Sequence, residues 1–361
     1  MLKMRFVFRF ETIFLQLNTS TFGHFVQESE LYLAKAQLNP KINIVFYPQK
    51  QISNKFWWEI VMENANCTSR AFGECFDRIL RLVSNSYRKR KLEFQNFTIE
   101  DYERLCVFSG IKLLNFNTEE KANFIVYLGE KSLNRDSEFV GLCLRDDKYD
   151  ALHGDEIKRA QQHRNVNSHL QLEIVKTLVN RKVPVVRLGR VGHRIIDNCT
   201  ELYLDLTQET KKVPDYLDFS LASRCKFVIS SGTGVDAAAV AARKRLYTFN
   251  IFPIGTFYKG DNFPFYLSQD YVCKFSGEKL DYTEIYSQNI ENTTLFELES
   301  IGIGIKPKSN QVVIDFVETI LKIENSIEFQ DNHVCFDLVK NKKIAEFCNR
   351  WGLIIVGNMI Y

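Results

Sequence analysis

The sequence predicts an α/β protein with two doubly wound domains, and three observations support this. Short apolar runs rich in aromatic and β-branched residues recur along the chain, a composition typical of buried strands. Helical patterns lie between several of these runs, and strands that alternate with helices favour parallel sheets covered on both faces. A polar stretch, KSLNRDSE (131–138), separates four early runs from five later ones, so we expect a domain boundary there.

The expected elements follow from these patterns in chain order. The runs expected to form strands are RFVFRF (5–10), INIVFYP (42–48), RLCVFSG (104–110), NFIVYLG (123–129), FVGLCLRD (139–146), VPVVRLG (183–189), ELYLDL (201–206), KFVISSG (226–232) and RLYTFNI (245–251). Apolar residues spaced for one helix face predict helices at 169–182 and 310–325. We therefore expect an N-terminal domain over 1–132, a second domain over 133–325, and a C-terminal segment over 326–361 that packs back on the body.

Composition narrows the function classes. The 361 residues are 45% hydrophobic and 25% charged, an ordinary globular profile that is long enough for two domains. A net charge of +3 is too small to indicate nucleic-acid binding. The basic run Arg88-Lys89-Arg90-Lys91 favours a solvated helix or loop face, with a peripheral contact to anionic lipid as the alternative. No segment reaches the length that spans a membrane.

Cysteine and histidine usage indicates neither disulfides nor a zinc site. The nine cysteines are scattered without a C-x-x-C pair, and several lie inside apolar strings. The six histidines form no H-E-x-x-H or Cys/His group. Free buried thiols are typical of a reducing compartment, so we expect a cytoplasmic protein.

One stretch, CKFVISSGTGVDAAAVAARKR (225–245), is a candidate anion site. It predicts a strand, a turn with two glycines, and an alanine-rich helix whose first turn presents backbone N–H groups. It is neither a Walker A loop nor a G-x-G-x-x-G fingerprint, and an ordinary strand-to-helix turn remains the alternative. We call the turn, 230–234, the Ser/Gly turn. Its candidate ligands for a phosphate are the hydroxyls and backbone of Ser230, Ser231, Gly232, Thr233 and Gly234.

Polar residues at other strand ends belong to the same candidate site. Ligands of doubly wound sheets bind beyond the carboxyl ends of the strands, where this sequence places Arg145, Arg187 and Gly189; Arg164 precedes the next helix. Guanidinium groups beside a helix N-terminus suit a diphosphate without a metal ion. For Arg145 and Arg187, the alternative is a structural ion pair, such as Arg145 with Asp146 or Asp147.

Several motifs, taken in order, resemble a known family. They are FGHFVQESELYL (22–33), QISNKF (51–56), FVGLCLRDDKY (139–149), HRNVN (163–167), VPVVRLG (183–189), DYLDFSLASRCKFVISSGTG (215–234), GEKLDYTEI (277–285) and ELESIGIGIKPKS (297–309). Together these motifs resemble the bacterial GT-B-type glycosyltransferases of surface-polysaccharide and protein-glycosylation loci, which are distantly similar to O-fucosyltransferases. The sequence departs from the family at Ala239 and at 242–245, where relatives tend to carry Pro and a Gly-x-Pro.

The resemblance implies two Rossmann-like domains facing across a cleft. It implies a nucleotide-sugar donor held by the second domain, and a glycan, glycolipid or protein acceptor presented by the first. The family acts in surface glycan biosynthesis, which implies a site of action in the cytoplasm at the inner face of the membrane. With arginines and a helix terminus available for the leaving diphosphate, we expect no metal ion and no cofactor.

The catalytic base stays open at this stage. An inverting transfer needs a base for the acceptor hydroxyl, and the candidates are His24, Glu28 one helical turn later, and Asp146. His24 has the alternative of capping or packing against a helix, as have the rings of Phe56-Trp57-Trp58, which could otherwise stack on a sugar. A nucleotide-sugar hydrolase or epimerase and a non-catalytic carbohydrate-binding protein remain as other functions. A dinucleotide oxidoreductase is disfavoured because no glycine fingerprint follows the first strand.

Overall fold

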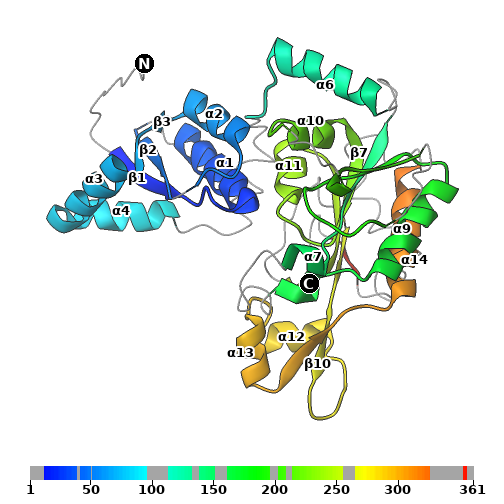
Figure 1. The fold of residues 1–361 in the computed structure, drawn as a ribbon. Helices are drawn as coiled ribbons and strands as arrows, with labels where there is room; N and C mark the ends of the chain where they lie inside the picture. The colour runs from blue at the N-terminus through cyan, green and yellow to red at the C-terminus, as the bar shows by residue number, and fades with distance from the viewer. Residues whose placement is uncertain are drawn as a thin grey trace.

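The chain folds around two parallel sheets, shown in Figure 1. The computed structural model describes residues 12–38, 41–49, 51–95, 113–131, 138–150, 161–195, 202–208, 214–254, 265–325 and 353–355. Within these ranges one sheet has three strands, a second has seven, and β10 and β11 form a separate ribbon. The predicted α/β class with parallel Rossmann-like sheets is confirmed.

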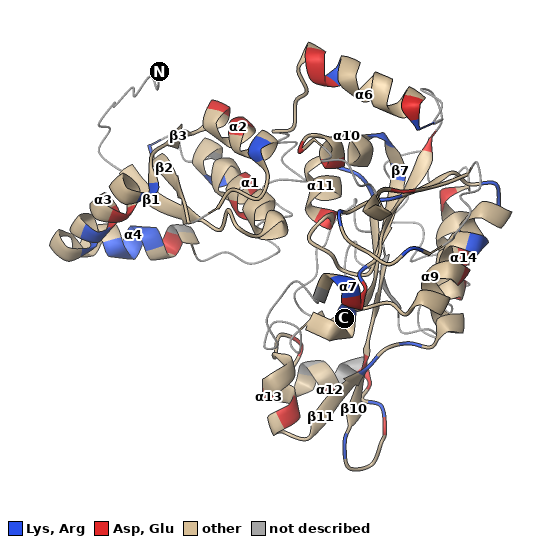
Figure 2. Cartoon of the chain, in the orientation of Figure 1, with Lys and Arg blue, Asp and Glu red and all other residues tan. Residues whose placement is uncertain are grey.

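The smaller sheet forms the N-terminal unit. Its strands are β1 (Thr12–Leu17), β2 (Asn43–Pro48) and β3 (Asn66–Cys67), and all run parallel. Its helices are α1 (Phe22–Leu38), α2 (Lys55–Asn64), α3 (Arg70–Val83) and α4 (Asn85–Gln95). Figure 2 shows the basic residues gathered on α4. The strand expected at 42–48 is β2, whereas the runs at 5–10 and 104–110 lie outside the described residues.

The strand predicted at 123–129 is wrong, because this run lies inside α6 (Thr118–Glu130). A capping box between Asn117 and Glu120 starts the helix: the Asn117 side chain accepts from the Glu120 backbone, and the Glu120 side chain accepts from Asn117. Phe124 and Leu128, four residues apart, are buried, while Val126 is 60% exposed. The buried apolar residues are four positions apart, as on one face of a helix. A short continuous apolar run does not distinguish this pattern from a buried strand.

The seven-stranded sheet forms the second unit. Its strands are β4 (Phe139–Cys143), β5 (Val185–Arg187), β6 (Tyr203–Asp205), β7 (Cys225–Ser230), β8 (Leu246–Ile251), β9 (Phe265–Ser268) and β12 (Leu353–Ile355). The spatial order is β12-β9-β8-β7-β4-β5-β6, and only β12, on β9, is antiparallel. All five strands predicted after the polar stretch are present. Counted from β4, the parallel strands have the 3-2-1-4-5-6 order of dinucleotide-binding sheets, with the reversal between β4 and β7.

Helices cover both faces of this sheet. The helix predicted at 169–182 is α9 (Ser168–Asn180) and that at 310–325 is α14 (Asn310–Glu324), and both pack on one face. On the other face lie α10 (Leu217–Arg224) and α11 (Asp236–Ala241). The remaining elements are α7 (Asp147–Asp150), η2 (Gln162–Arg164), η3 (Leu206–Gln208), β10 (Asp270–Cys273), α12 (Tyr282–Ser287), α13 (Leu295–Ser300) and β11 (Ile303–Lys306). In the described part of the chain, no helix is both long and apolar enough to cross a membrane.

The predicted boundary at residue 132 stays a prediction, since 132–137 lie outside the described residues. The helix just before it, α6, packs against α10 of the second unit through Phe124 and Leu128. Helix α6 therefore packs as part of the unit that contains the larger sheet.

The two units meet along α1 and α11. The face of α11 that meets the N-terminal core consists of small, fully buried side chains, those of Ala237, Ala238 and Ala241. Small side chains let helix axes approach closely. At the same contact, a Cβ added to Gly23 of α1 would lie 3.1 Å from the Cα of Gly234. The backbones of α1 and the Ser/Gly turn are therefore in van der Waals contact.

Aromatic rings and a helix cap extend this contact. Trp57 stacks on Phe219 of α10, with ring centroids 5.0 Å apart, and its Nε1 donates to Ser29 Oγ at 2.8 Å. The Asp215 carboxylate accepts from the backbone N–H of Lys55 at 2.8 Å and so caps α2 from the other unit. Of the aromatic residues 56–58, Trp57 therefore packs inside the protein, which is the alternative to stacking on a sugar.

An ion pair closes the far end of the contact. Arg243 follows α11 with φ of 57°, a left-handed conformation that favours glycine, and it lies in the stretch where the sequence departs from the Gly-x-Pro of the resembling family. Its guanidinium donates to Val240 O at 2.8 Å and pairs with the buried Glu30 of α1 at 2.6 Å. The energetic cost of the left-handed backbone at Arg243 is offset by this ion pair between the two units.

We expect Arg243→Gly to destabilise the protein by about 2 kcal/mol or more, although it relieves the backbone strain. The reason is that the buried Glu30 carboxylate loses this counter-charge, and breaking a buried pair costs more than one left-handed residue. Urea unfolding measures the change, with Glu30→Gln/Arg243→Gly as the matched control that should recover most of it. A wild-type midpoint for Arg243→Gly alone would show that the pair contributes nothing.

Candidate functional site

The candidate site lies at the carboxyl ends of β4 and β7, where the strand order reverses. Cys143 of β4 is in register with Ser230 of β7. Beyond them, the backbone N–H of Arg145 donates to Ser231 Oγ at 3.0 Å, and the Ser231 N–H donates to Cys143 O at 3.0 Å. The structure thus brings together the start of the Arg145 loop and the Ser/Gly turn. Crevices at such reversals are where doubly wound sheets bind nucleotides.

Inside the Ser/Gly turn the hydroxyls are held by Asp236. The Asp236 carboxylate accepts from Ser230 Oγ at 2.6 Å, from Thr233 Oγ at 3.0 Å and from the Thr233 N–H at 3.0 Å. Gly232 N–H donates in turn to Ser230 Oγ at 2.9 Å. Burial raises the pKa of Asp236 to about 6, against the lowering effect of these hydrogen bonds. The side chains of Ser230 and Thr233 therefore fix the shape of the turn.

Two predicted arginines lie beside the turn. A Cβ added to Gly232 would be 3.9 Å from Cδ of Arg164, and the charge of Arg164 lowers the pKa of Asp236. Arg145 donates from Nη1 to Gln161 Oε1 at 2.7 Å, and its guanidinium lies over the Tyr149 ring at 4.6 Å from the centroid. The structure therefore places the Arg164 side chain beside the turn and bonds the Arg145 backbone to it, while the guanidinium of Arg145, a residue 7% exposed, is held by Gln161.

Arg187 lies in a different environment. Its side chain is fully buried at the end of β5, between the carboxylates of Asp146 at 3.1 Å and Asp205 at 3.3 Å. It also donates to His193 O at 2.5 Å. A Cβ on Gly192 would come within 2.5 Å of Nη2 of Arg187, so the loop fits tightly around the guanidinium. For Arg187 the structure shows the ion-pair alternative, and its role is to hold the loops after β4 and β5.

Asp146 is the partner that fixes this loop. Its Oδ2 accepts from His193 N–H at 2.7 Å and from Arg187, and its Oδ1 accepts from Lys148 N–H at 3.1 Å. Because both oxygens are engaged and the residue is 4% exposed, it is poorly placed to take a substrate proton. Gly189, with φ of +116°, begins the loop that Arg187 and Asp146 hold.

The two candidate bases of the first unit lie in α1. His24 is exposed in the first turn of the helix, next to Gly23, which touches Gly234. Glu28 lies one turn later and accepts from Asn18 N–H at 3.2 Å. Burial raises the pKa of Glu28, and the nearby His24 lowers it. His24 is thus the candidate base that is both exposed and adjacent to the turn.

Sequence reasoning did not assign three residues to the site, although Asp236, three positions after Thr233, was expected to lie close to a capping-box arrangement. Asp236 organises the turn, Asp205 balances Arg187, and His193 lies with Nε2 2.7 Å from Asp147. Asp205 is the last residue of β6, within the run ELYLDL, so its position at a strand end was a signal visible in the sequence. His193 had no such signal. With Asp146 and Asp147, His193 forms a group whose ligand atoms lie within 4.8 Å and could hold a metal ion, although Asp146 already pairs with Arg187.

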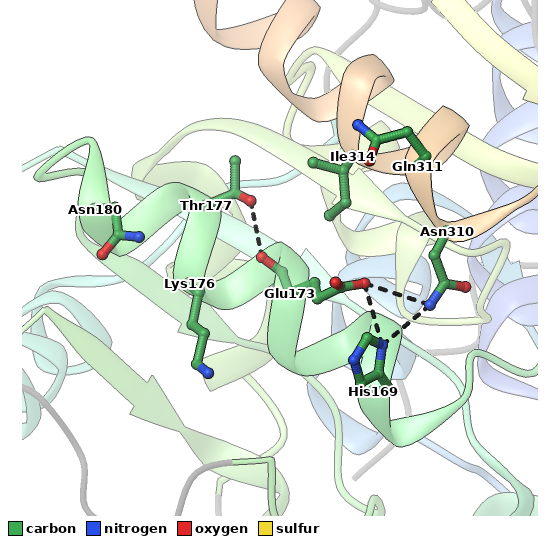
Figure 3. A pocket seen from close by; sticks show the side chains of 8 residues that line it. All are labelled: His169, Glu173, Lys176, Thr177, Asn180, Asn310, Gln311 and Ile314. Atoms are coloured by element: carbon green, nitrogen blue, oxygen red, sulfur yellow. Dashed lines mark hydrogen bonds and ion pairs between the residues drawn. The ribbon is translucent and has the colours of Figure 1, made fainter.

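Two hollows among the described residues lie away from this site. One, of about 440 Å³, opens between α9 and α14, and Figure 3 shows its polar lining of His169, Glu173 and Asn310. Another, of about 280 Å³, lies between α6 and α10. Neither is lined by the Ser/Gly turn, so the site rests on its side-chain geometry.

Comparison with known proteins finds similarity in structure alone. No family model matches the chain, and no curated protein matches it in sequence. A glycosyltransferase of family 9 from Veillonella parvula matches with 8% identity and a TM-score of 0.48, over 86% of this chain and 96% of that one. The ADP-heptose lipopolysaccharide heptosyltransferase II of E. coli matches with 16% identity and a TM-score of 0.40, over 66% of this chain and 84% of that one. E. coli heptosyltransferase WaaC with ADP matches with 13% identity and a TM-score of 0.38, over 72% of this chain and 92% of that one. Values this low leave substrate and activity open.

We expect Asp236 to make the protein less stable as the pH rises from about 4 to about 6. Its folded pKa lies above its unfolded value, so the folded state binds a proton that the unfolded state releases in this range. The stability it contributes is complete below pH 4 and lost above pH 6. Relative to Asp236→Asn, the wild type should lose about 2–3 kcal/mol across this window, an upper figure from the shift. Urea unfolding of both proteins at several pH values tests this, and parallel curves would contradict it.

Proposed function

We propose that the protein is a GT-B-type glycosyltransferase that moves a sugar from a nucleotide-sugar donor to a hydroxyl of a glycan, glycolipid or protein acceptor. One observation carries the proposal: Arg145, Arg164 and the Ser/Gly turn lie together at the strand-order reversal of a 3-2-1-4-5-6 sheet. This arrangement supports binding of a nucleotide diphosphate. The sequence resemblance supports a sugar as the transferred group and a role in surface glycan biosynthesis.

In this proposal the second unit binds the diphosphate, which is the leaving group. Arg164 and Arg145 balance the charge that develops on it, with the backbone of Gly232 and Gly234 offering close approach. Ser230 and Thr233 keep the turn in shape through Asp236 rather than contact the phosphates. Arg187 positions the loop of Arg145 through its ion pair with Asp146.

The first unit supplies the acceptor side. We assign His24 as the general base, because it is exposed in α1 beside the contact of Gly23 with Gly234. Glu28 is the next candidate, since its raised pKa brings it closer to the range of a base that works at neutral pH. Asp146 becomes a positioning residue.

A thermal-shift screen of UDP-, GDP-, ADP- and CMP-sugars tests the donor half of the proposal. The ligand that stabilises the protein is then used, radiolabelled, in a transfer assay with a crude surface-glycan and protein extract. We expect incorporated label in the presence of EDTA, because arginines supply the charge that a metal ion would supply. Release of free sugar without incorporation would favour the hydrolase alternative. Binding without either product would favour a carbohydrate-binding protein, and activity restored only by Mg²⁺ or Mn²⁺ would make the group around His193 a metal site.

We expect Arg164→Ala to weaken binding of the donor about 10- to 150-fold, the equivalent of one charge-assisted hydrogen bond of about 1.5–3 kcal/mol. Titration calorimetry with the donor identified above measures it. Arg194→Ala is the matched control, because Arg194 is exposed in the loop after β5 and should leave the affinity unchanged. Equal affinities for the wild type and Arg164→Ala would remove Arg164 from the site.

We expect His24→Ala to lower turnover about 10²- to 10⁴-fold while the donor binds as before, since loss of a general base affects the transition state and spares the phosphate contacts. Single-turnover transfer and donor titration separate the two effects. His169→Ala, which removes an exposed histidine of the second unit, serves as the control. Normal transfer by His24→Ala would shift the assignment to Glu28.

A further inference from the structure

The helical hairpin of α3 and α4 forms the end of the N-terminal unit that lies farthest from the second sheet (Figure 1). One face of α3 packs on the small sheet through Phe72, Phe76 and Leu80. Exposed apolar residues near the C-terminal end of α3 and basic residues of the neighbouring α4 lie at the tip of this hairpin. None of them takes part in the site described above.

Positive charge is concentrated on this hairpin, as Figure 2 shows. Between Arg70 and Gln95 the sequence has seven Lys and Arg but three Asp and Glu, whereas the whole chain has a net charge of +3. The positive excess of the protein is therefore confined to one pair of helices. Such a surface attracts polyanions more strongly than the overall charge indicates.

The basic run divides into one structural residue and three surface residues. Asp77, fully buried, pairs with Lys91 at 2.6 Å and with Arg81 at 2.6 Å, and accepts from the Tyr87 hydroxyl at 2.7 Å. These bonds fix α4 against α3 and bury Lys91. The other three residues of the run, at 88–90, are exposed.

Large apolar side chains lie beside these charges. Ile79, Leu82 and Val83 of α3 are 48%, 72% and 74% exposed, and their spacing puts them on one helix face. Arg88 donates from Nε to the carbonyl of Arg81, in the last turn of α3. This bond places the first charge of the run beside the exposed apolar residues at the turn of the hairpin.

We propose that the tip of the α3–α4 hairpin docks on an anionic lipid surface. Leu82 and Val83 enter the headgroup region, and Arg88, Lys89 and Arg90 contact lipid phosphates. Basic residues that flank exposed aliphatic side chains are the combination that binds helices at membrane interfaces. A nucleic acid would use the charges alone and leave the aliphatic side chains in water. The proposal is independent of the transfer reaction.

Sedimentation with vesicles tests this docking. Vesicles of phosphatidylcholine with 30% phosphatidylglycerol should bind the full-length wild type, and pure phosphatidylcholine should bind it far more weakly. Arg88→Gln/Lys89→Gln/Arg90→Gln should lower partitioning about 100-fold, at about 1 kcal/mol per basic residue. Leu82→Ser/Val83→Ser should lower it about tenfold or more, because its apolar side chains no longer enter the interface.

Matched controls and a competing polyanion decide between the outcomes. Ile125→Ser/Val126→Ser removes two exposed apolar residues of α6 and should bind like the wild type. Circular dichroism confirms that each variant is folded. Absence of wild-type binding to the anionic vesicles, or equal binding by the hairpin variants, would overturn the proposal. So would a DNA duplex that binds the wild type as tightly as the vesicles do and is indifferent to Leu82→Ser/Val83→Ser.

Discussion

The contact between α1 and α11 is the constraint on which the rest of the candidate site depends. Alanines on α11 and glycines at 23 and 234 bring the two backbones together. A Cβ at Gly23 would come within 3.1 Å of the Gly234 Cα, whereas a Cβ at Gly234 would make an ordinary contact, 3.5 Å from the Gly23 nitrogen. Because His24 follows Gly23 directly, the distance between the candidate base and the Ser/Gly turn is set by this contact. Under the proposed function, the acceptor side and the donor side would thus be placed by packing before any substrate binds.

Buried charges then fix the loops on the donor side. One network joins Arg187 to Asp146, which follows β4, and to Asp205, which ends β6. The other network joins Asp236 to the turn after β7. Buried pairs contribute little net stability, but removing one partner is expensive, so their main effect here is to specify one loop geometry. Arg145 lies where the networks meet, since its N–H bonds Ser231 and its neighbour Asp146 bonds Arg187. The loop that carries this candidate phosphate ligand is therefore held from both sides.

The sequence predicted the second unit better than the first, for physical reasons. Strands buried on both faces are continuous apolar runs, and the five runs predicted after residue 138 are all strands, whereas β9 to β12 were not predicted. The run at 123–129 is equally apolar, yet the capping box at Asn117 and burial four residues apart make it a helix. Arg145 could be proposed for the site because it follows a predicted strand, and Arg164 because it precedes a predicted helix. The burial of Arg187 could not, because it depends on Asp205, which is distant in sequence and adjacent only once β5 and β6 pair. The alanines of α11 indicated a helix but not that α1 packs on it.

The two ends of the N-terminal unit have different constraints. At one end α1 contacts the donor side through residues without large side chains, and a change there would alter the site. At the other end, the hairpin is fixed to its own sheet by Asp77 and by the packing of Phe72 and Phe76, so its outer surface can vary without moving α1. A lipid surface bound at the hairpin would lie away from the Ser/Gly turn, because the small sheet separates α3 and α4 from the second unit (Figure 1). Attachment and transfer could then be altered separately, since the residues proposed for each share no hydrogen bond or ion pair among those described.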